Sequence, residues 1–532
     1  MDGVDFSSEK LRYTDDNITL NTNYESRIVR CGGTGWDIFI RGAEDSWAEP
    51  NETESFREYP QMFDDLTGSG FDVIFLDFAE GATFIQKNSM VLKALITRIN
   101  NEKDAEAKEE NIVVGASMGG QVARMALAQM ERDKQNHCTR MYVSFDSPQK
   151  GANIPLSLQG FSWLAAYTEL LPDNWISLNT PAAKQMLIET LADDVVKGKL
   201  TLTLTKDGTA IPNPLFRPNT LRPAFVAEMA ALGYPQKVEN ISIVDGDERG
   251  RKITGDVGVP FPNNAPMLSV QPSFLGLVGV PIVTANLFAL NGASNFGNGI
   301  PNATVFSGNI PLKIHAQGPV NLGISAQEMT KAVFTLNQTL PTFDNAPGCM
   351  RGDLRGIRRL VNDGQTALTK ATGGLFTLAF PAAGFQPNFC FMPTMSTLDI
   401  RNPNNPNEWN WDINPSILQN KIKDAKITQN QLTPFFDYYA PETGNLRHVE
   451  IDPLMREWIK QFLKDTDKDD LTKYKVLPYN GKPKYAYNYR KNHITSVSVN
   501  PEGTLSVNDG GNYSAFNSNA NIGLKNRDST LK

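Results

Sequence analysis

The sequence predicts an α/β fold in which a mostly parallel central sheet is flanked by helices. Two observations support this prediction. Segments with strand character alternate with segments of helical periodicity through residues 1–150, and a Gly-x-Ser-x-Gly motif at 115–119 joins one such strand to the helix that follows. Strands separated by helices of this length favour parallel βαβ units, because a parallel connection needs a long crossover.

The elements of residues 1–150 follow from composition and periodicity. Four segments have the β-branched and aromatic composition of strands, and two have the apolar spacing of helices. The expected strands are 26–31, 71–78, 111–115 and 141–145, and the expected helices are 85–100 and 119–133. We assign this region to the N-terminal half of the core.

Beyond residue 150 the 532-residue sequence predicts a completed core with several additions. In chain order these are a helical cap (151–237), a core strand (238–250), a β-rich insertion (251–388), the C-terminal part of the core (389–470) and a β extension or tail (471–532). The last helix is expected at 453–464, where the apolar residues are spaced for one buried face.

One stretch of the insertion, 257–312, contains no Asp, Glu, Lys or Arg. Its segment 273–290 is long enough to raise the question of a membrane span. Pro281 and Asn286 interrupt this segment, and no Lys or Arg anchors bracket it, so we expect strands and no transmembrane span. The low charge indicates burial, or an apolar surface that contacts a lipid-like substrate.

Charge and cysteine content exclude several classes of function. Lys plus Arg number 51 and Asp plus Glu 58, which gives a net charge of −7 and no basic field of the kind that binds nucleic acid. The four cysteines form no Cys-x-x-Cys pair, and no P-loop, dinucleotide-binding glycine fingerprint or His-Glu-x-x-His motif occurs. We therefore expect no metal and no organic cofactor. The oligomeric state stays open.

The motif Gly115-Ala116-Ser117-Met118-Gly119 predicts a nucleophilic serine. A serine on a tight strand-to-helix turn sits in strained backbone, and small neighbours let the chain pack closely around it. This exposes the hydroxyl at the N-terminus of the helix, where the backbone N–H of Met118 can stabilise an oxyanion.

The sequence resembles the α/β-hydrolase superfamily, and most of all its secreted bacterial lipase- and esterase-like members, at 71–78, 115–131 and 141–155. Where those lipases have a Pro-His-x-Gly turn, Gln149 replaces the histidine, which affects local packing more than chemistry. The resemblance implies an α/β-hydrolase fold, cleavage of carboxylic esters through an acyl-enzyme, and a secreted or cell-surface location. The N-terminus has no signal-peptide pattern, and a cytoplasmic location stays open.

A serine nucleophile needs a general base, and the chain has four histidines. His448 follows an expected strand at 435–439 and precedes the last helix, which is where this fold places its catalytic histidine. We expect His448 to be the base. The remaining histidines are assigned to a helix cap, the insertion and the tail, and they are His137, His315 and His493.

The acid that orients this histidine is left open between several carboxylates. Asp247, which follows the strand at 241–244, is placed first, with Asp245 and Glu248 beside it. Asp146 ends the strand at 141–145 and is placed second, since some lipases take their acid from that position. Two less favoured candidates for the acid are Asp344 and Asp399.

A second oxyanion donor is expected in the glycine-rich loop 32–35, with Gly33 ahead of Thr34. Two alternatives stand beside the ester hydrolase. An acyltransferase would use the same triad, and a non-catalytic surface-binding protein would use the same scaffold without the chemistry. The acyl-chain length and head group of a substrate do not follow from the sequence.

Overall fold

The computed structural model divides the chain into two compact units. Unit 1 comprises 1–151, 223–249 and 394–532, and unit 2 comprises 152–222 and 250–393. The residues that the structure describes are 26–31, 62, 66, 71–76, 78, 81–102, 110–167, 172–247, 266–274, 277–278, 284–288, 298–299, 302–316, 324–338, 340–341, 343–344, 346, 348–353, 376–379, 388–400, 433–435, 437–441, 444–464, 496–499, 504–508 and 521–523.

The centre of unit 1 is a six-stranded sheet in the order β18-β7-β4-β3-β1-β2. Every neighbouring pair in it is parallel. Its strands are β1 (Ser26–Cys31), β2 (Phe71–Leu76), β3 (Asn111–Ala116), β4 (Thr139–Phe145), β7 (Glu239–Ile243) and β18 (Asp437–Tyr439). Parallel strands bring their carboxyl ends to one edge of the sheet, so the loops that follow β3, β4, β7 and β18 meet there.

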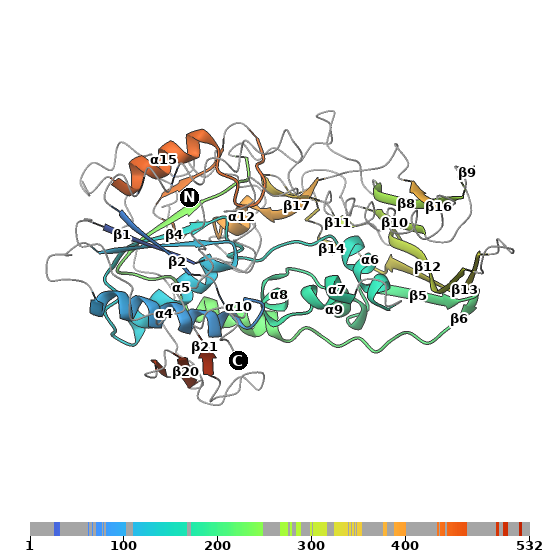
Figure 1. Ribbon diagram of the computed structural model, residues 1–532, viewed down its shortest axis with the longest axis horizontal. Helices are drawn as coiled ribbons and strands as arrows, with labels where there is room; N and C mark the ends of the chain where they lie inside the picture. Colours follow the sequence, from blue (N-terminus) through green and yellow to red (C-terminus); the bar gives the residue numbers. More distant parts are fainter. Residues whose placement is uncertain are drawn as a thin grey trace. The chain divides into compact units, whose positions relative to one another are not determined.

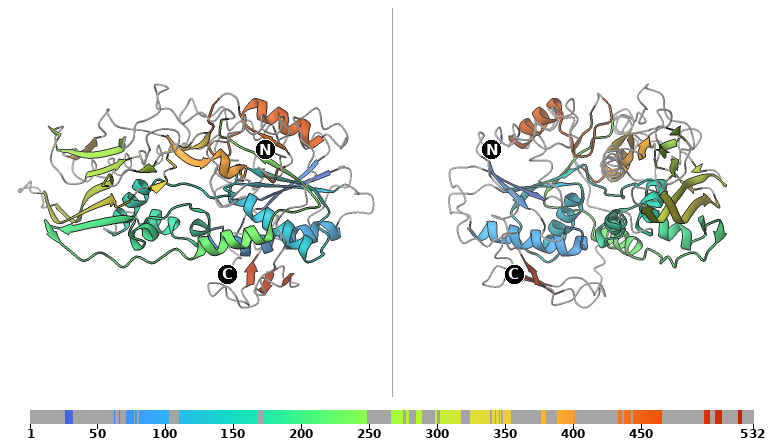
Figure 2. Two further views of the ribbon diagram at one scale, coloured as in Figure 1. Left: turned by 180° about the vertical axis from the view of Figure 1, so that it is seen from behind. Right: turned by 45° about the vertical axis from the view of Figure 1, so that its right-hand side comes forward.

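Helices cover both faces of this sheet. Helices α4 (Ile85–Glu102) and α5 (Met118–Arg132) lie on one face, and α15 (Pro453–Lys464) lies on the other (Figures 1 and 2). Every residue of α5 from Met118 to Met130 is buried, because α4 packs on one side of it and β3, β4 and β1 on the other. The start of α5 therefore has a fixed position relative to the end of β3.

The described part of unit 1 also contains the short helix α12 (Thr394–Thr397), the helix α10 (Leu221–Leu232) and a small sheet. Helix α10 leads into β7, and the small antiparallel sheet packs against α4. That sheet consists of β19 (Ser496–Val499), β20 (Thr504–Asn508) and β21 (Asn521–Gly523).

Unit 2 is built on an antiparallel sheet of eight strands, ordered β16-β8-β10-β12-β13-β5-β6 with β9 paired to β8. The strands are β5 (Leu200–Lys206), β6 (Thr209–Ala210), β8 (Pro266–Phe274), β9 (Leu277–Val278), β10 (Thr284–Phe288), β12 (Thr304–Ala316), β13 (Ile324–Leu336) and β16 (Phe376–Ala379). Two short pairs accompany it, β11 (Asn298–Gly299) with β14 (Leu340–Pro341) and β15 (Cys349–Asp353) with β17 (Asn388–Pro393).

The uncharged stretch 257–312 supplies β8, β9, β10, β11 and the first part of β12. Three of these strands, β8, β10 and β12, are neighbours in the unit 2 sheet, in agreement with the strands expected for this stretch. In the described part of the chain, no helix combines the length and the hydropathy needed to cross a bilayer.

The segment expected to be a helical cap, 151–237, differs from that expectation in two respects. It contains the short helices α6 (Leu156–Tyr167), α7 (Pro172–Leu178), α8 (Pro181–Met186) and α9 (Leu191–Val196), but also β5 and β6. Along β5, buried Leu alternates with exposed Thr, which is the two-residue period of a half-buried strand, and β5 pairs with β13. Most of α10, moreover, belongs to unit 1.

The core of unit 2 lies between α6 and the sheet. Trp163 of α6 meets Phe334 of β13 edge to face, with ring centroids 5.4 Å apart, and Phe306 of β12 lies beside Phe334. Edge-to-face packing of this kind stabilises beyond the area that it buries.

Candidate active site

Ser117 lies on the sharp turn between β3 and α5. Its backbone has φ 51° and ψ −126°, a conformation that costs energy for a residue with a Cβ atom. Three hydrogen bonds hold it. The Ser117 N–H donates to the Phe145 carbonyl (2.9 Å), and the Ser117 carbonyl accepts from the Gly120 N–H (3.0 Å) and from Ser147 Oγ (2.6 Å). The surrounding structure thus fixes the strained turn.

Two glycines at this turn are required by close packing. A Cβ atom on Gly115 would lie 2.5 Å from Gly120 Cα, and a Cβ on Gly120 would lie 2.5 Å from the Cβ of Ser147. Both distances are shorter than any real contact of a Cβ atom, and in the first case the obstacle is backbone. The motif therefore has small residues where β3, α5 and the loop after β4 come together.

Met118 is the first residue of α5, immediately after Ser117. The first N–H groups of an α-helix have no partner within the helix, and the helix dipole gives this end a partial positive charge. The Met118 N–H is thus placed to stabilise negative charge that develops next to the Ser117 hydroxyl.

His448 and Asp146 form a hydrogen-bonded pair, although they are far apart in the sequence. His448 Nδ1 lies 2.8 Å from Asp146 Oδ2, and the Val449 N–H donates to the same oxygen at 3.3 Å. The Asp146 side chain is 1% exposed and that of His448 is 22% exposed. A carboxylate on Nδ1 fixes the orientation of the imidazole and leaves Nε2 as the nitrogen that can accept a proton.

Strained backbone occurs at this pair as well as at the serine. Asp146 has φ 47° and Val449, next to His448, has φ 51°. A positive φ is a marked outlier for a β-branched residue such as Val. Strain of this kind persists only where neighbouring contacts impose it, and it gathers at functional sites.

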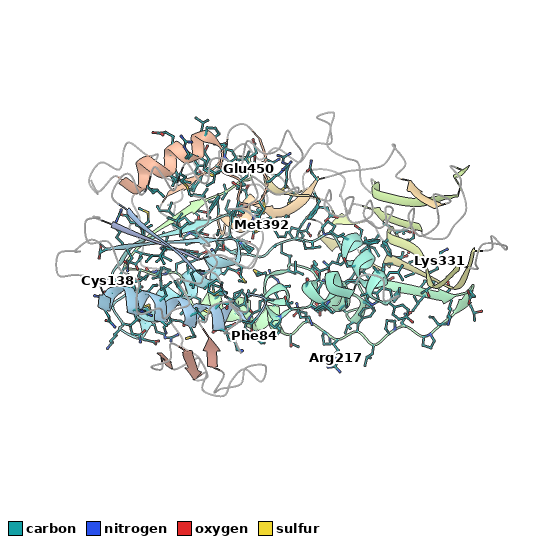
Figure 3. The ribbon with its side chains drawn as sticks, viewed as in Figure 1. Phe84, Cys138, Arg217, Lys331, Met392 and Glu450 are labelled. Carbon is teal, nitrogen blue, oxygen red and sulfur yellow. The ribbon has the colours of Figure 1, made fainter. Side chains whose placement is uncertain are left out.

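The carboxylates that follow β7 have other partners. The Asp247 N–H donates to Asn445 Oδ1 at 2.9 Å, and the Asp247 side chain is buried. The Asp245 N–H donates to Asp146 Oδ1 at 3.3 Å, and Asp245 Oδ2 accepts from the backbone N–H of Glu450, which lies just before α15 (Figure 3). The structure thus brings the second-placed acid, Asp146, to His448, while Asp247 holds the loop at Asn445.

The two less favoured candidates for the acid lie in other environments. Asp344, in unit 2, accepts a hydrogen bond from Asn153 Nδ2 at 3.0 Å. Asp399, in unit 1, accepts from the Tyr234 hydroxyl at 3.1 Å. Donors to these two carboxylates thus include an amide and a hydroxyl group.

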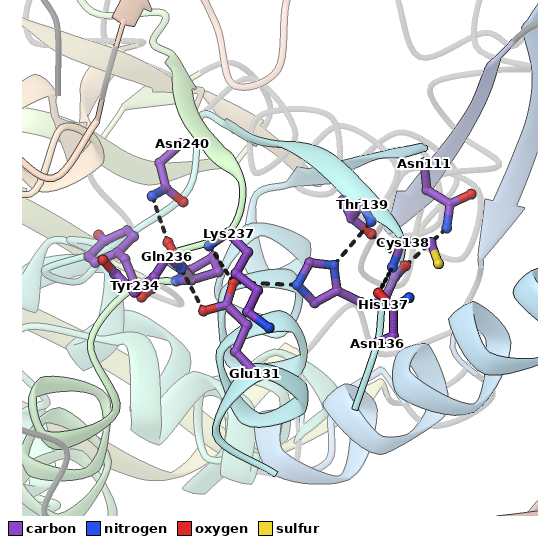
Figure 4. Close-up of polar contacts among 11 residues, drawn as sticks. Asn111, Glu131, Asn136, His137, Cys138, Thr139, Tyr234, Gln236, Lys237 and Asn240 are labelled. Carbon is purple, nitrogen blue, oxygen red and sulfur yellow. Dashed lines mark hydrogen bonds and ion pairs between the residues drawn. The ribbon is translucent and has the colours of Figure 1, made fainter. Parts of the chain in front are cut away.

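His137 takes part in a polar cluster where β4 and β7 begin, instead of capping α5, which ends before it (Figure 4). Its Nδ1 accepts from the Thr139 N–H at 3.1 Å, and its Nε2 lies 3.4 Å from Glu131 Oε1. Glu131 also accepts from the backbone N–H groups of Gln236 and Lys237, at 2.6 and 2.7 Å. The cluster fastens the end of α5 to the segment that precedes β7.

Some of the predicted residues cannot be placed. Gly33, Thr34, Glu248 and His493 lie outside the described residues. His315 lies on β12, where the described part is the backbone.

Gln149 stands at the position of the lipase histidine, and its side chain makes hydrogen bonds with four other residues. Its Nε2 donates to the Tyr142 hydroxyl (3.0 Å) and to Ser144 Oγ (2.9 Å), and its Oε1 accepts from Arg124 of α5 (3.1 Å) and from the Tyr234 hydroxyl (3.3 Å). One amide thus connects β4, α5 and the segment after α10. The sequence pattern pointed to packing at this position without naming the partners, which come from distant segments.

No family model matches the chain, and no curated protein sequence matches it. Thirteen chains of solved structures are similar to it in part. One is the mature lipase BlEst2 from Bacillus licheniformis, 14% identical, with 45% of this chain and 70% of that chain covered at a TM-score of 0.23. Another is a lipase-esterase related protein from Clostridium acetobutylicum, 15% identical, with coverages of 42% and 75% and a TM-score of 0.20. A third is a type II thioesterase of the yersiniabactin pathway, 12% identical, with coverages of 43% and 77% and a TM-score of 0.22.

Proposed function

We propose that this protein is a serine hydrolase that cleaves carboxylic esters through an acyl-enzyme intermediate. Ser117 is the nucleophile, His448 the general base and Asp146 the acid. One observation carries the proposal: the 2.8 Å contact between His448 Nδ1 and Asp146 Oδ2, at the edge of the parallel sheet where β3 delivers Ser117. Strained backbone at Ser117 and Asp146 supports it, because residues held in strained backbone cluster at active sites.

The reaction follows from the roles of these groups. Ser117 Oγ attacks the ester carbonyl and gives its proton to His448 Nε2, while Asp146 stabilises the imidazolium through Nδ1. The Met118 N–H binds the oxyanion, and Gly33 is proposed as the second donor. His448 then protonates the leaving alcohol, and a water molecule activated by the same imidazole releases the acid and restores Ser117.

Covalent labelling tests the proposal directly. A fluorophosphonate probe should label the wild-type chain at Ser117, and Ser117→Ala should abolish the label. Ser177→Ala is a matched control, since Ser177 is an exposed serine of α7 in the other unit, and it should label as wild type does. A wild-type chain that stays unlabelled where an active lipase reacts would refute the proposal.

The fate of the acyl group separates hydrolysis from transfer. With p-nitrophenyl butyrate and an added primary alcohol, the proposal expects free butyrate to be the main product. Predominant formation of the butyrate ester of the added alcohol would instead identify an acyltransferase with the same triad.

A further inference from the structure

Two carboxyl groups, not one, lie at the edge of the sheet beside His448. Asp146 follows β4 and Asp245 follows β7, and these two strands are paired in parallel with Phe145 opposite Ile243. The Asp146 side chain is 1% exposed and Asp245 is fully buried. The 3.3 Å hydrogen bond from the Asp245 N–H to Asp146 Oδ1 holds them next to each other.

The two groups differ in the hydrogen-bond donors that they receive. Asp146 accepts from the Asp245 N–H at Oδ1, from the Val449 N–H at Oδ2, and contacts the His448 ring at Oδ2. The carboxyl group of Asp245 accepts one hydrogen bond, at Oδ2, from the Glu450 N–H at 3.1 Å. Its other oxygen, Oδ1, is buried and has no donor in the described part of the chain.

This asymmetry decides where a proton resides. Two adjacent carboxylates in a buried site do not both ionise, because burial and mutual repulsion disfavour the second charge. The group with more donors holds the charge, and the group with an oxygen lacking a donor holds the proton. Burial, followed by the negative charge of Asp146 and a side-chain hydrogen bond with it, raises the pKa of Asp245 well above its ordinary range. The charge of Glu450 acts in the same direction, whereas its backbone N–H opposes it.

We propose that Asp245 is protonated at neutral pH and donates a hydrogen bond from its carboxylic acid to Asp146, which keeps Asp146 ionised and oriented against His448. Asp245 is then a positioning residue that acts through Asp146 and touches no reacting atom. This role rests on the proposed function, but the protonation itself does not.

The charge count at the site follows from this arrangement. The pair carries one negative charge, on Asp146, and the titratable groups that face it are His448 and Glu450. His448 therefore faces the field of one aspartate and not of two.

Replacement of Asp245 by asparagine tests the role in catalysis. The asparagine side chain copies the neutral acid, since its amide N–H can donate to Asp146 and its carbonyl can accept from the Glu450 N–H. We expect kcat/KM for p-nitrophenyl butyrate within about twofold of wild type and an unchanged midpoint of the acidic limb of the pH profile. If Asp245 were ionised, Asp245→Asn would remove a negative charge near His448, lower the pKa of the imidazole and move that limb to lower pH. Such a shift would overturn the proposal.

A variant without the donor gives the opposite result. Asp245→Leu keeps the number and branching of the heavy side-chain atoms but leaves Asp146 without its carboxylic-acid partner. We expect kcat to fall by about 10- to 100-fold with KM little changed, as for other residues that orient a catalytic ligand. If Asp245→Leu folds and keeps wild-type kcat, Asp245 has no positioning role.

Infrared spectroscopy of ¹³C-aspartate-labelled protein reads the proton without any activity. Asp194→Asn is the background for this experiment, because burial raises the pKa of Asp194 to about 8 and this acid would give a carboxylic-acid band of its own at neutral pH. At neutral pH, Asp194→Asn and Asp194→Asn/Ser117→Ala should both show a carboxylic-acid carbonyl band that Asp194→Asn/Asp245→Asn lacks. An Asp194→Asn spectrum without the band refutes the protonation of Asp245, whatever the enzyme does. A spectrum with the band in a protein that is not labelled at Ser117 supports the protonation and refutes only the proposed function.

Discussion

Each unit of the molecule contains a buried acidic group beside a second acid, but the two clusters are neutralised differently. In unit 2, Lys199 Nζ lies 3.0 Å from both Asp194 Oδ1 and Glu189 Oε2, so a cation sits between the acids. In unit 1, Asp146 and Asp245 have no lysine or arginine partner among the contacts of the described residues, and a histidine ring faces them. In the first cluster a lysine thus contacts both acids. The second is poised to hold a proton and a single charge against an imidazole.

The contrast shows when a raised pKa of a buried acid indicates a functional site. Burial, followed by the charge of Glu189, raises the pKa of Asp194 to about 8, and Lys199 opposes this shift. A raised pKa is thus common to both clusters, and it does not separate them. What separates them is the partner: a lysine that compensates charge in one case, and a histidine at the end of parallel strands in the other.

Of the substitutions that test this comparison, Asp146→Asn is expected to have the largest effect, on kcat/KM. The amide cannot hold the imidazole in the required tautomer or stabilise its positive charge, so kcat/KM should fall by about 10⁴-fold. Initial rates with p-nitrophenyl butyrate measure this. The far-ultraviolet circular dichroism should match that of wild type, which separates lost chemistry from lost folding. A loss below tenfold would mean that another carboxylate serves as the acid.

The ion cluster of unit 2 should respond in stability instead. Lys199→Met removes the cation that contacts Asp194 and Glu189. We expect the free energy of unfolding to fall by about 1 to 2 kcal/mol, between the values for an exposed and a buried pair, because Lys199 is partly exposed. Urea denaturation followed by tryptophan fluorescence measures it. Lys197→Met is the control, since Lys197 pairs with Asp193 near the surface, and it should cost about 0.5 kcal/mol. Equal losses in the two variants would contradict the assignment.

The free energy of unfolding of unit 2 should depend on pH through the titration of Asp194. Because its pKa in the folded chain is about 8, above the ordinary range, the folded state binds more protons than the unfolded state between about pH 4 and pH 8. This contribution therefore favours folding at low pH and is lost as the pH rises through that window. We expect Asp194→Asn to reduce the drop in unfolding free energy between pH 5 and pH 8, measured by urea denaturation at both values. A drop as large as in wild type would exclude Asp194 as its source.

The smallest effect is expected at Glu450, whose charge adds to that of Asp146 in raising the pKa of Asp245. Glu450→Gln keeps the backbone N–H that Asp245 accepts from and removes only the charge. The infrared band of Asp245 should then titrate at a lower pH than in wild type. Glu457→Gln, on an exposed position of α15, should leave the titration unchanged. A shift in the opposite direction would contradict the inferred source of the effect.

Local elements of this molecule could be predicted from sequence because their determinants are local. The turn at Ser117 needs a strand, a small residue at 115 and a helix, and all three are contiguous in the chain. Helix α15 begins and ends at the residues that its apolar spacing indicated, 453 and 464. The strand β5 was open to the same treatment, since its Leu-Thr alternation is a strand pattern, but it lies inside a region of short helices.

The partner of His448 could not be chosen from the sequence. Asp146 and Asp245 each follow a parallel strand by a residue or two, and their local patterns are equivalent. The choice depends on the path of the chain after β18, which carries His448 and the Val449 N–H to Asp146 and the Glu450 N–H to Asp245. None of these contacts produces a periodic pattern of residues in the sequence. The link between the two acids is a product of strand order alone.

The distance along the chain between the two members of the histidine pair has a consequence for biosynthesis. Asp146 and His448 are 302 residues apart. At a translation rate of about 5 to 20 residues per second, the ribosome makes the serine and the acid some 15 to 60 s before the imidazole. A nascent chain with the proposed chemistry is thus unreactive until His448 has been made and has reached Asp146.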